Sequence, residues 1–174
     1  MKISNASLAT ALSALLLAST SSWAVDPAHN GALNVPANRI VGLWITAAAV
    51  SPCGSGLPPA PLQNTILFNA GGTVVESPVI PPGGIPGASG VPGINQRGQA
   101  LGTWYYNPVS KQYSVKLRFD WYVDGQYHGY QTVDRVISLT SNGNEAVGAV
   151  QSTRYAADGS TIVQVCGDAV SDRL

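Results

Sequence analysis

Three side chains in the second half of the chain are candidates for acid–base chemistry: Asp134, His128 and Tyr130. A carboxyl group, an imidazole and a phenol can each move protons in an active site. His128 and Asp134 are six residues apart, and on one strand that separation is roughly 20 Å, at about 3.3 Å per residue. They cannot then form a dyad, so each would need another partner. These residues are weak catalytic candidates, and whether the protein is an enzyme stays open.

Established catalytic and metal-binding patterns are not found in the sequence. It has no serine nucleophile elbow, no glycine loop that leads into a helix and no carboxylates paired at a usable spacing. Two well-separated cysteines with only His29 and His128 available disfavour a zinc site. We therefore expect neither a metal nor a cofactor.

The first 24 residues are typical of a cleavable export signal. Lys2 precedes an apolar run, and Ser22-Trp23-Ala24 places small residues at the −3 and −1 positions of a cleavage site. A membrane anchor would need about 20 consecutive apolar residues, whereas serine and threonine at positions 19–22 end the run early. The sequence predicts a periplasmic or extracellular protein with no transmembrane segment.

The two cysteines agree with export. Cys53 and Cys166 are an even number in a chain predicted to reach a compartment where thiols oxidise readily. We predict a disulfide between them, the alternative being two free thiols or half of a metal site.

Composition narrows the class of protein. The chain has 174 residues, of which 45% are apolar and 10% charged, with 19 glycines and 12 prolines. This profile is typical of a turn-rich globular domain and unlike that of highly charged disordered chains. Removing Lys2 with the signal leaves one acidic side chain in excess, so there is no positive field to attract nucleic acid.

The elements that must position these residues are β-strands. After an irregular arm at 25–38, β-branched and aromatic residues and the turns between them predict one barrel domain over 39–174. Asp124-Gly125, Asn142-Gly143 and Asp158-Gly159 are tight hairpin turns. We expect strands at 40–50, 62–69, 72–77, 99–106, 112–123, 126–139, 144–155 and 160–170. The pattern predicts an all-β, eight-stranded antiparallel up-and-down barrel, closed or nearly closed.

A Pro/Gly-rich segment at 77–98 interrupts this pattern. Its prolines exclude a central strand. A loop of this length is generally either functional or disordered, so we expect a lid over the barrel mouth or a mobile loop without function.

Which side chains face the interior of the barrel depends on the register between residues 112–123 and 126–139. Residues 112–123 alternate, with Phe119 and Trp121 on the inward face. A two-residue turn at Asp124-Gly125 would turn His128, Tyr130 and Asp134 inward. A two-residue turn at Asn142-Gly143 would place Gln151 opposite Asp134, as a partner in a hydrogen bond. A three-residue turn with a bulge would instead send inward the residues Tyr127, Gln131, Val133, Arg135 and Ile137.

Aromatic residues could line an apolar cavity or fill the barrel as a packed core. The candidates for the cavity are Trp104, Tyr106, Tyr113, Phe119, Trp121, Tyr130 and Tyr155. The other acidic residues fall at turns or strand ends and are expected to be solvated: Glu76, Glu145, Asp158 and Asp172.

Gly42-Leu43-Trp44 resembles the Gly-x-Trp motif of lipocalin and calycin barrels, and Arg173 resembles the arginine that packs over that tryptophan. Longer blocks, among them Leu101-Gly102-Thr103-Trp104 and Val165-Cys166-Gly167-Asp168, resemble a calycin-like family of secreted bacterial β-barrels without an assigned activity. The resemblance implies a barrel floor built from Gly42, Trp44 and Arg173. The chain lacks the Thr-Asp-Tyr block of lipocalins, so their transport function does not carry over.

Three functions follow as hypotheses. The first is an exported barrel that binds a small apolar or aromatic molecule in its cavity. The second is a cofactor-free cyclase or isomerase, by analogy with other calycin-like barrels. The third is an envelope or extracellular interaction protein with a packed barrel, whose contacts could include Leu43 and Ile45.

Overall fold

The computed structural model describes residues 35–174. The predicted signal peptide and most of the predicted arm lie outside the described residues. The last part of that arm is more regular than expected, because Pro36–Ile40 form the 3-10 helix η3. Proline at the first position suits the helix start, and Ile40 is fully buried against the barrel. Within residues 35–174, no helix is long and apolar enough to cross a membrane.

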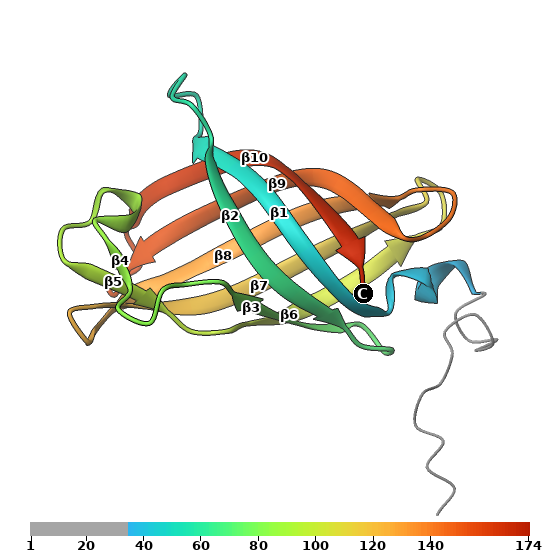
Figure 1. The fold of residues 1–174 in the computed structure, drawn as a ribbon, viewed down its shortest axis with the longest axis horizontal. Helices are drawn as coiled ribbons and strands as arrows, with labels where there is room; N and C mark the ends of the chain where they lie inside the picture. Colours follow the sequence, from blue (N-terminus) through green and yellow to red (C-terminus); the bar gives the residue numbers. More distant parts are fainter. Residues whose placement is uncertain (1–34) are drawn as a thin grey trace, which may run out of the picture.

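Eight antiparallel strands close a barrel, as the sequence predicts (Figure 1). Their order around the barrel is β1, β2, β3, β6, β7, β8, β9 and β10, and β10 pairs with β1 again. The bounds are β1 Gly42–Pro52, β2 Ala60–Phe68, β3 Thr73–Pro78, β6 Ala100–Asn107, β7 Gln112–Val123, β8 Gln126–Leu139, β9 Glu145–Ala156 and β10 Thr161–Arg173.

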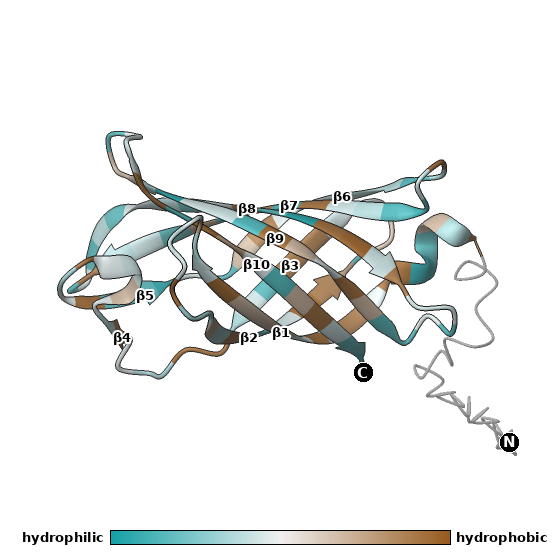
Figure 2. Ribbon diagram, turned by 90° about the horizontal axis from the view of Figure 1, so that it is seen from above, coloured by the Kyte–Doolittle hydropathy of each residue, from teal (hydrophilic) through white to brown (hydrophobic). Residues whose placement is uncertain are grey.

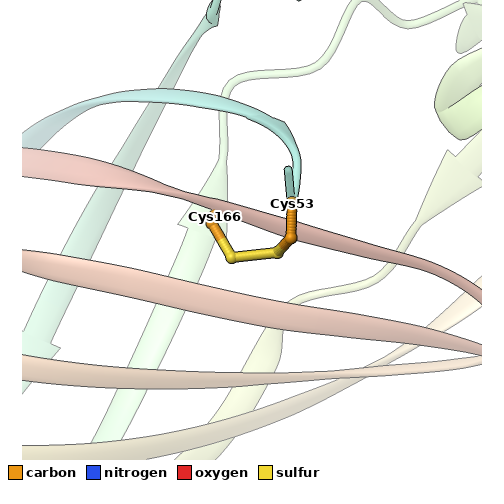
Figure 3. Close-up of a disulfide and its surroundings, with 2 residues drawn as sticks. All are labelled: Cys53 and Cys166. Carbon is orange, nitrogen blue, oxygen red and sulfur yellow. A yellow bond between two sulfur atoms is a disulfide. The ribbon is translucent and has the colours of Figure 1, made fainter. Parts of the chain in front are cut away.

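A disulfide links the first and last strands of the barrel, β1 and β10. Strands β1 and β10 pair from Trp44 with Arg173 to Pro52 with Val165. Cys53, the residue after β1, is bonded to Cys166, which pairs with Ser51 within that ladder, across 113 residues of sequence (Figure 3). The predicted disulfide is confirmed, and it fixes the seam where the barrel closes.

The Pro/Gly-rich segment contains short elements. Strand β4 (Ile85–Pro86) pairs with β5 (Ile94–Arg97), and the 3-10 turn η4 (Ala88–Gly90) lies between them. Strand β5 also pairs with β7, beside Trp121 to Val123, beyond the part of β7 that β6 occupies. Side-chain hydrogen bonds support this hairpin, because Asn95 donates to the carbonyls of Val91 and Gly93.

The register of β8 combines features of both expected alternatives. The turn at Asp124-Gly125 has two residues, since Val123 pairs with Gln126, but a register shift follows and Trp121 pairs with Gly129. Gly129 accommodates this shift, because its φ is +136° and an added Cβ would lie 2.1 Å from the Tyr155 carbonyl oxygen. From this point onward the shifted register holds, and it turns inward Gln131, Val133, Arg135 and Ile137.

The bulge therefore overturns the inward placement of Asp134, which the unshifted register would give. Asp134 does pair with Gln151 across the strands, but its side chain is 56% exposed and lies beside Lys116 on the outer face. The second alternative, a three-residue turn with a bulge, placed Tyr127 inward. Because the observed bulge follows Tyr127 along β8, Tyr127 keeps the unshifted register and is exposed.

Apolar side chains gather at the end of the barrel that η3 covers. In Figure 2, hydrophobic and hydrophilic positions alternate along the long strands, as expected when one face is buried. The largest buried side chains at the η3 end include Trp44, Ile66, Tyr113 and Ile137. This end is a packed core, and the polar interior lies further along the barrel.

Candidate functional site

The floor of the barrel is built around Trp44 and Arg173. The guanidinium carbon of Arg173 lies 4.2 Å from the centre of the Trp44 ring, and its nitrogens donate to the carbonyls of Val41, Gly143 and Arg39. Gly42 leaves room for this group, because an added Cβ would lie 2.8 Å from Arg173 Nη1. The stacked pair and η3 close this end of the barrel.

Most of the aromatic residues considered for a cavity belong to the packed core. Trp104, Tyr113, Phe119 and Trp121 are buried in one cluster, and Tyr106 packs against it. Their ring pairs include Trp104 with Tyr113 at 5.9 Å and Phe119 with Trp121 at 5.7 Å between centroids. These rings pack against the chain's own side chains, so the parts of the interior where they lie are a packed core.

Tyr130 and Tyr155 lie on the outer face of the barrel. Their rings stack with centroids 4.8 Å apart, and the guanidinium of Arg118, an outward residue of β7, lies 4.5 Å from the Tyr130 ring centre. The register shift explains this placement, because a slip of one residue sends a side chain to the opposite face.

The acid–base candidates are not brought together. Asp134 and Tyr130 face outward. His128 is half-buried, and its Nδ1 has no hydrogen-bond partner in the part of the chain that the structure describes. No contact joins these residues to one another within that part, so a catalytic role for Asp134, His128 or Tyr130 stays a prediction.

A cavity of about 60 Å³ lies in the middle of the barrel. Half of its lining residues are apolar: Ala48, Val50, Leu62, Val133, Val150, Val165 and Ala169. The other half are polar or charged: Thr46, Asn64, Glu76, Arg97, Gln131, Arg135 and Ser152. Leu62 is 47% exposed, so the lining reaches the protein surface on the side of β2. The aromatic residues expected to line a cavity are not part of this wall.

Three charged side chains face this cavity. Glu76 is only 3% exposed, which corrects its expected place as a solvated cap. Its carboxylate forms an ion pair with Arg97, with Oε1 and Nη2 2.7 Å apart, and the Arg97 guanidinium also lies 3.5 Å from the centre of the Phe119 ring. This ion pair neutralises one of the two cavity arginines.

Arg135 is the second arginine, and it is 5% exposed. Burial lowers the pKa of Arg135 to about 10, and nearby Glu76 partly opposes this shift. The group therefore keeps its charge at neutral pH. Its Nη2 donates one long hydrogen bond, 3.4 Å, to Ser171 Oγ, and its Nε finds no acceptor among residues 35–174.

A chain of hydrogen bonds holds two of the polar lining residues, Gln131 and Ser152, in place. Trp121 Nε1 donates to Gln131 Oε1 at 2.6 Å, and Gln131 Nε2 donates to Ser152 Oγ. Ser152 Oγ in turn donates to the Thr132 carbonyl at 2.7 Å. Because each group is fixed by the next, Gln131 and Ser152 present defined polar surfaces to the cavity.

The Pro/Gly-rich segment covers the end of the barrel opposite η3 (Figure 1). Arg154, fully buried inside the barrel, donates from Nη1 to the Ala88 carbonyl and from Nη2 to Asn95 Oδ1, at 3.0 and 2.9 Å. Its guanidinium also lies 4.3 Å from the centre of the Trp121 ring. Arg154 thus attaches η4 and β5 to the barrel interior.

The charged interior was not recognised from the sequence. Glu76 immediately precedes the Pro/Gly-rich segment and Arg97 lies near its end, where solvated side chains are the usual expectation. The sequence placed Arg135 inside the barrel only in the alternative with a three-residue turn and a bulge. Strand alternation was the one available signal, and it could identify Arg135 only after the register was known.

The outer face carries exposed apolar side chains. Leu43 and Ile45, the contacts considered for an interaction protein, are both exposed. Nothing described here shows what would cover them, so the interaction role stays a prediction.

Comparisons with family models, curated proteins and solved structures found no significant match. Within residues 35–174, no group of three or more His, Cys, Asp or Glu side chains is arranged to hold a metal ion. The closed eight-stranded antiparallel barrel is compatible with a calycin-like fold.

Proposed function

We propose that this protein binds a small organic molecule inside its barrel, at the cavity between the packed floor and the Pro/Gly-rich segment. The observation that carries the proposal is a cavity lined by both apolar side chains and buried charged or polar side chains. Ligand sites combine apolar surface with a few fixed polar groups in this way. Two buried polar atoms of the lining residues, Asn64 Oδ1 and Arg135 Nε, also have no partner among the described residues, and a ligand would supply partners for them.

The size of the cavity restricts the ligand. An apolar cavity of about 150 Å³ holds benzene, whereas this cavity has about 60 Å³. An aromatic ring therefore does not fit unless side chains move. We propose a ligand of a few non-hydrogen atoms, in place of the aromatic ligand that the sequence suggested. A longer molecule could also bind with one end in the cavity and the rest extending to the protein surface beside Leu62.

The compartment fits such a role. A barrel with the Cys53–Cys166 disulfide is consistent with an oxidising, exported environment. We propose that the protein works in the periplasm or outside the cell, where it meets small solutes directly.

Two neighbouring alanines allow a matched test. Ala48 lines the cavity, and Ala49 is exposed on the opposite face of β1. In Ala48→Leu the added atoms occupy the cavity, whereas in Ala49→Leu they enter solvent. Binding of small neutral and charged probes, measured by ligand-observed NMR, is expected for the wild type and Ala49→Leu, with at least a tenfold loss in Ala48→Leu.

Thermal unfolding of both variants establishes that each is folded, and Ala48→Val replaces Ala48→Leu if the larger side chain prevents folding. The proposal is wrong if no probe binds the wild-type protein, or if binding is equal in the Ala48 and Ala49 variants.

A further inference from the structure

We infer that the cavity takes a small monocarboxylate and that Arg135 binds its carboxylate group. This inference rests on the ligand-binding role proposed above and specifies the chemical class of the ligand.

The charged side chains that line the cavity have a net charge of one positive unit. Arg97 and Arg135 contribute two positive charges, and Glu76 is the one acidic side chain in the cavity wall. Glu76 is already in contact with Arg97 at 2.7 Å. A ligand with a single negative charge would neutralise the remainder, whereas a doubly charged phosphate monoester would leave a buried negative charge in excess.

The hydrogen bonds of Arg135 point to an acceptor with two oxygens. A guanidinium has five N–H donors in a planar fork that matches a carboxylate. Among residues 35–174, Arg135 makes one long contact with Ser171, and its Nε is buried without an acceptor. Burial of an unmatched donor on a charged group is costly, and a bound carboxylate would remove this cost.

A second unmatched atom suggests what accompanies the carboxylate. Asn64 Oδ1 lines the same cavity and is buried without a donor among the described residues. A ligand hydroxyl would supply that donor. Glycolate, which joins a carboxylate to a hydroxyl through one carbon, is small enough for this space and is the appropriate probe.

The experiment measures glycolate binding by isothermal titration calorimetry on the disulfide-bonded protein. Glycolamide is the neutral probe of nearly the same shape. Arg135→Gln removes the charge at the cavity, and Arg118→Gln is the matched control because Arg118 lies on the outer face, with its side chain 59% exposed.

We expect glycolate to bind the wild type and Arg118→Gln with similar affinity and to bind Arg135→Gln at least tenfold more weakly. Glycolamide should bind at least tenfold more weakly than glycolate. If Arg135→Gln does not fold, Arg135→Met, which keeps an unbranched stem without the charge, takes its place.

The inference is overturned if glycolate binding is unchanged in the Arg135 variant, or if glycolate does not bind while neutral probes do. In the second case binding that is lost in Ala48→Leu would still support the proposed function. If no probe of either kind binds, both proposals are wrong.

Discussion

Arg135 carries a charge that the described part of the protein does not neutralise. It is buried, has one long hydrogen bond and lies near a carboxylate that is already paired with Arg97. Burial disfavours the charged form, which is why the pKa of Arg135 falls to about 10. In the absence of ligand this residue should therefore reduce the stability of the barrel.

The first prediction follows from that cost. Arg135→Met should raise the free energy of unfolding of the ligand-free protein by about 1–3 kcal/mol, since an apolar side chain replaces an unmatched buried charge. Urea unfolding measures the change. A less stable variant would mean that the charge of Arg135 is compensated in the folded protein, against the geometry described above.

A substitution of Glu76 should lower the stability of the barrel. Glu76→Gln removes the one acidic group of the cavity and leaves both arginines uncompensated, so stability should fall by about 3–5 kcal/mol. Urea unfolding at pH 7 measures this loss. Arg135→Met should raise stability by more in the Glu76→Gln protein than in the wild type, because it then removes a charge that no carboxylate offsets; strictly additive effects would show that Glu76 and Arg135 are not coupled.

At the scale of elements, the register of β8 depends on Gly129. Its φ of +136° is a conformation that other residues rarely adopt, and the backbone of β9 occupies the space of a Cβ. Because the strand period is two, this bulge decides which side chains of β8 face the cavity.

Gly129→Ala should lower the free energy of unfolding by at least about 1–3 kcal/mol, through strain and close contact with β9. Gly98→Ala is the control, because an added Cβ at Gly98 meets no atom within 4 Å and should change stability by less than about 0.5 kcal/mol. Denaturant unfolding compares the two, and equal stability of the variants would contradict this explanation of the bulge.

The Pro/Gly-rich segment is the second element with a distinct role. Its attachment to the barrel depends on Arg154, whose two hydrogen bonds reach Ala88 and Asn95. Hydrogen bonds to a charged group contribute about 1.5–3 kcal/mol each, so their loss should release the segment locally.

Arg154→Met should therefore increase the rate of thermolysin cleavage between residues 79 and 93 at least tenfold, as measured by mass spectrometry of the fragments. Arg118→Gln, on the outer face, should leave the rate unchanged. Equal cleavage of Arg154→Met and wild type would show that other contacts hold the segment in place.

At the scale of the whole molecule, closure joins the beginning of the barrel to its end. The ladder between β1 and β10 and the Cys53–Cys166 bond connect segments 113 residues apart. Such a link restricts the unfolded chain more than the folded one, which is the main origin of its stabilising effect in the chain-entropy model.

The double variant Cys53→Ser/Cys166→Ser should lose about 2–5 kcal/mol of stability while it retains its β-sheet circular dichroism spectrum. A reducing agent should destabilise the wild type by a similar amount and should leave the double variant unchanged. If the double variant is as stable as the wild type, the barrel closes without help from the bond.

Much of the molecule follows from local patterns in the sequence. Hairpin turns such as Asp124-Gly125 and the alternation along residues 112–123 are encoded by neighbouring residues, so the strands, their order and the closed barrel could be predicted. The disulfide followed from the number of cysteines and the predicted export.

The interior of the barrel was decided by tertiary structure. A bulge beside Gly129 depends on the close approach of β9, a contact that local sequence does not specify, and one step of register exchanges the two faces of a strand. That step placed Asp134 and Tyr130 outside and Arg135 inside. The ion pair of Glu76 with Arg97 likewise required β3 to pair with β6 and β5 to pair with β7, so the charged cavity could be recognised only in the folded molecule.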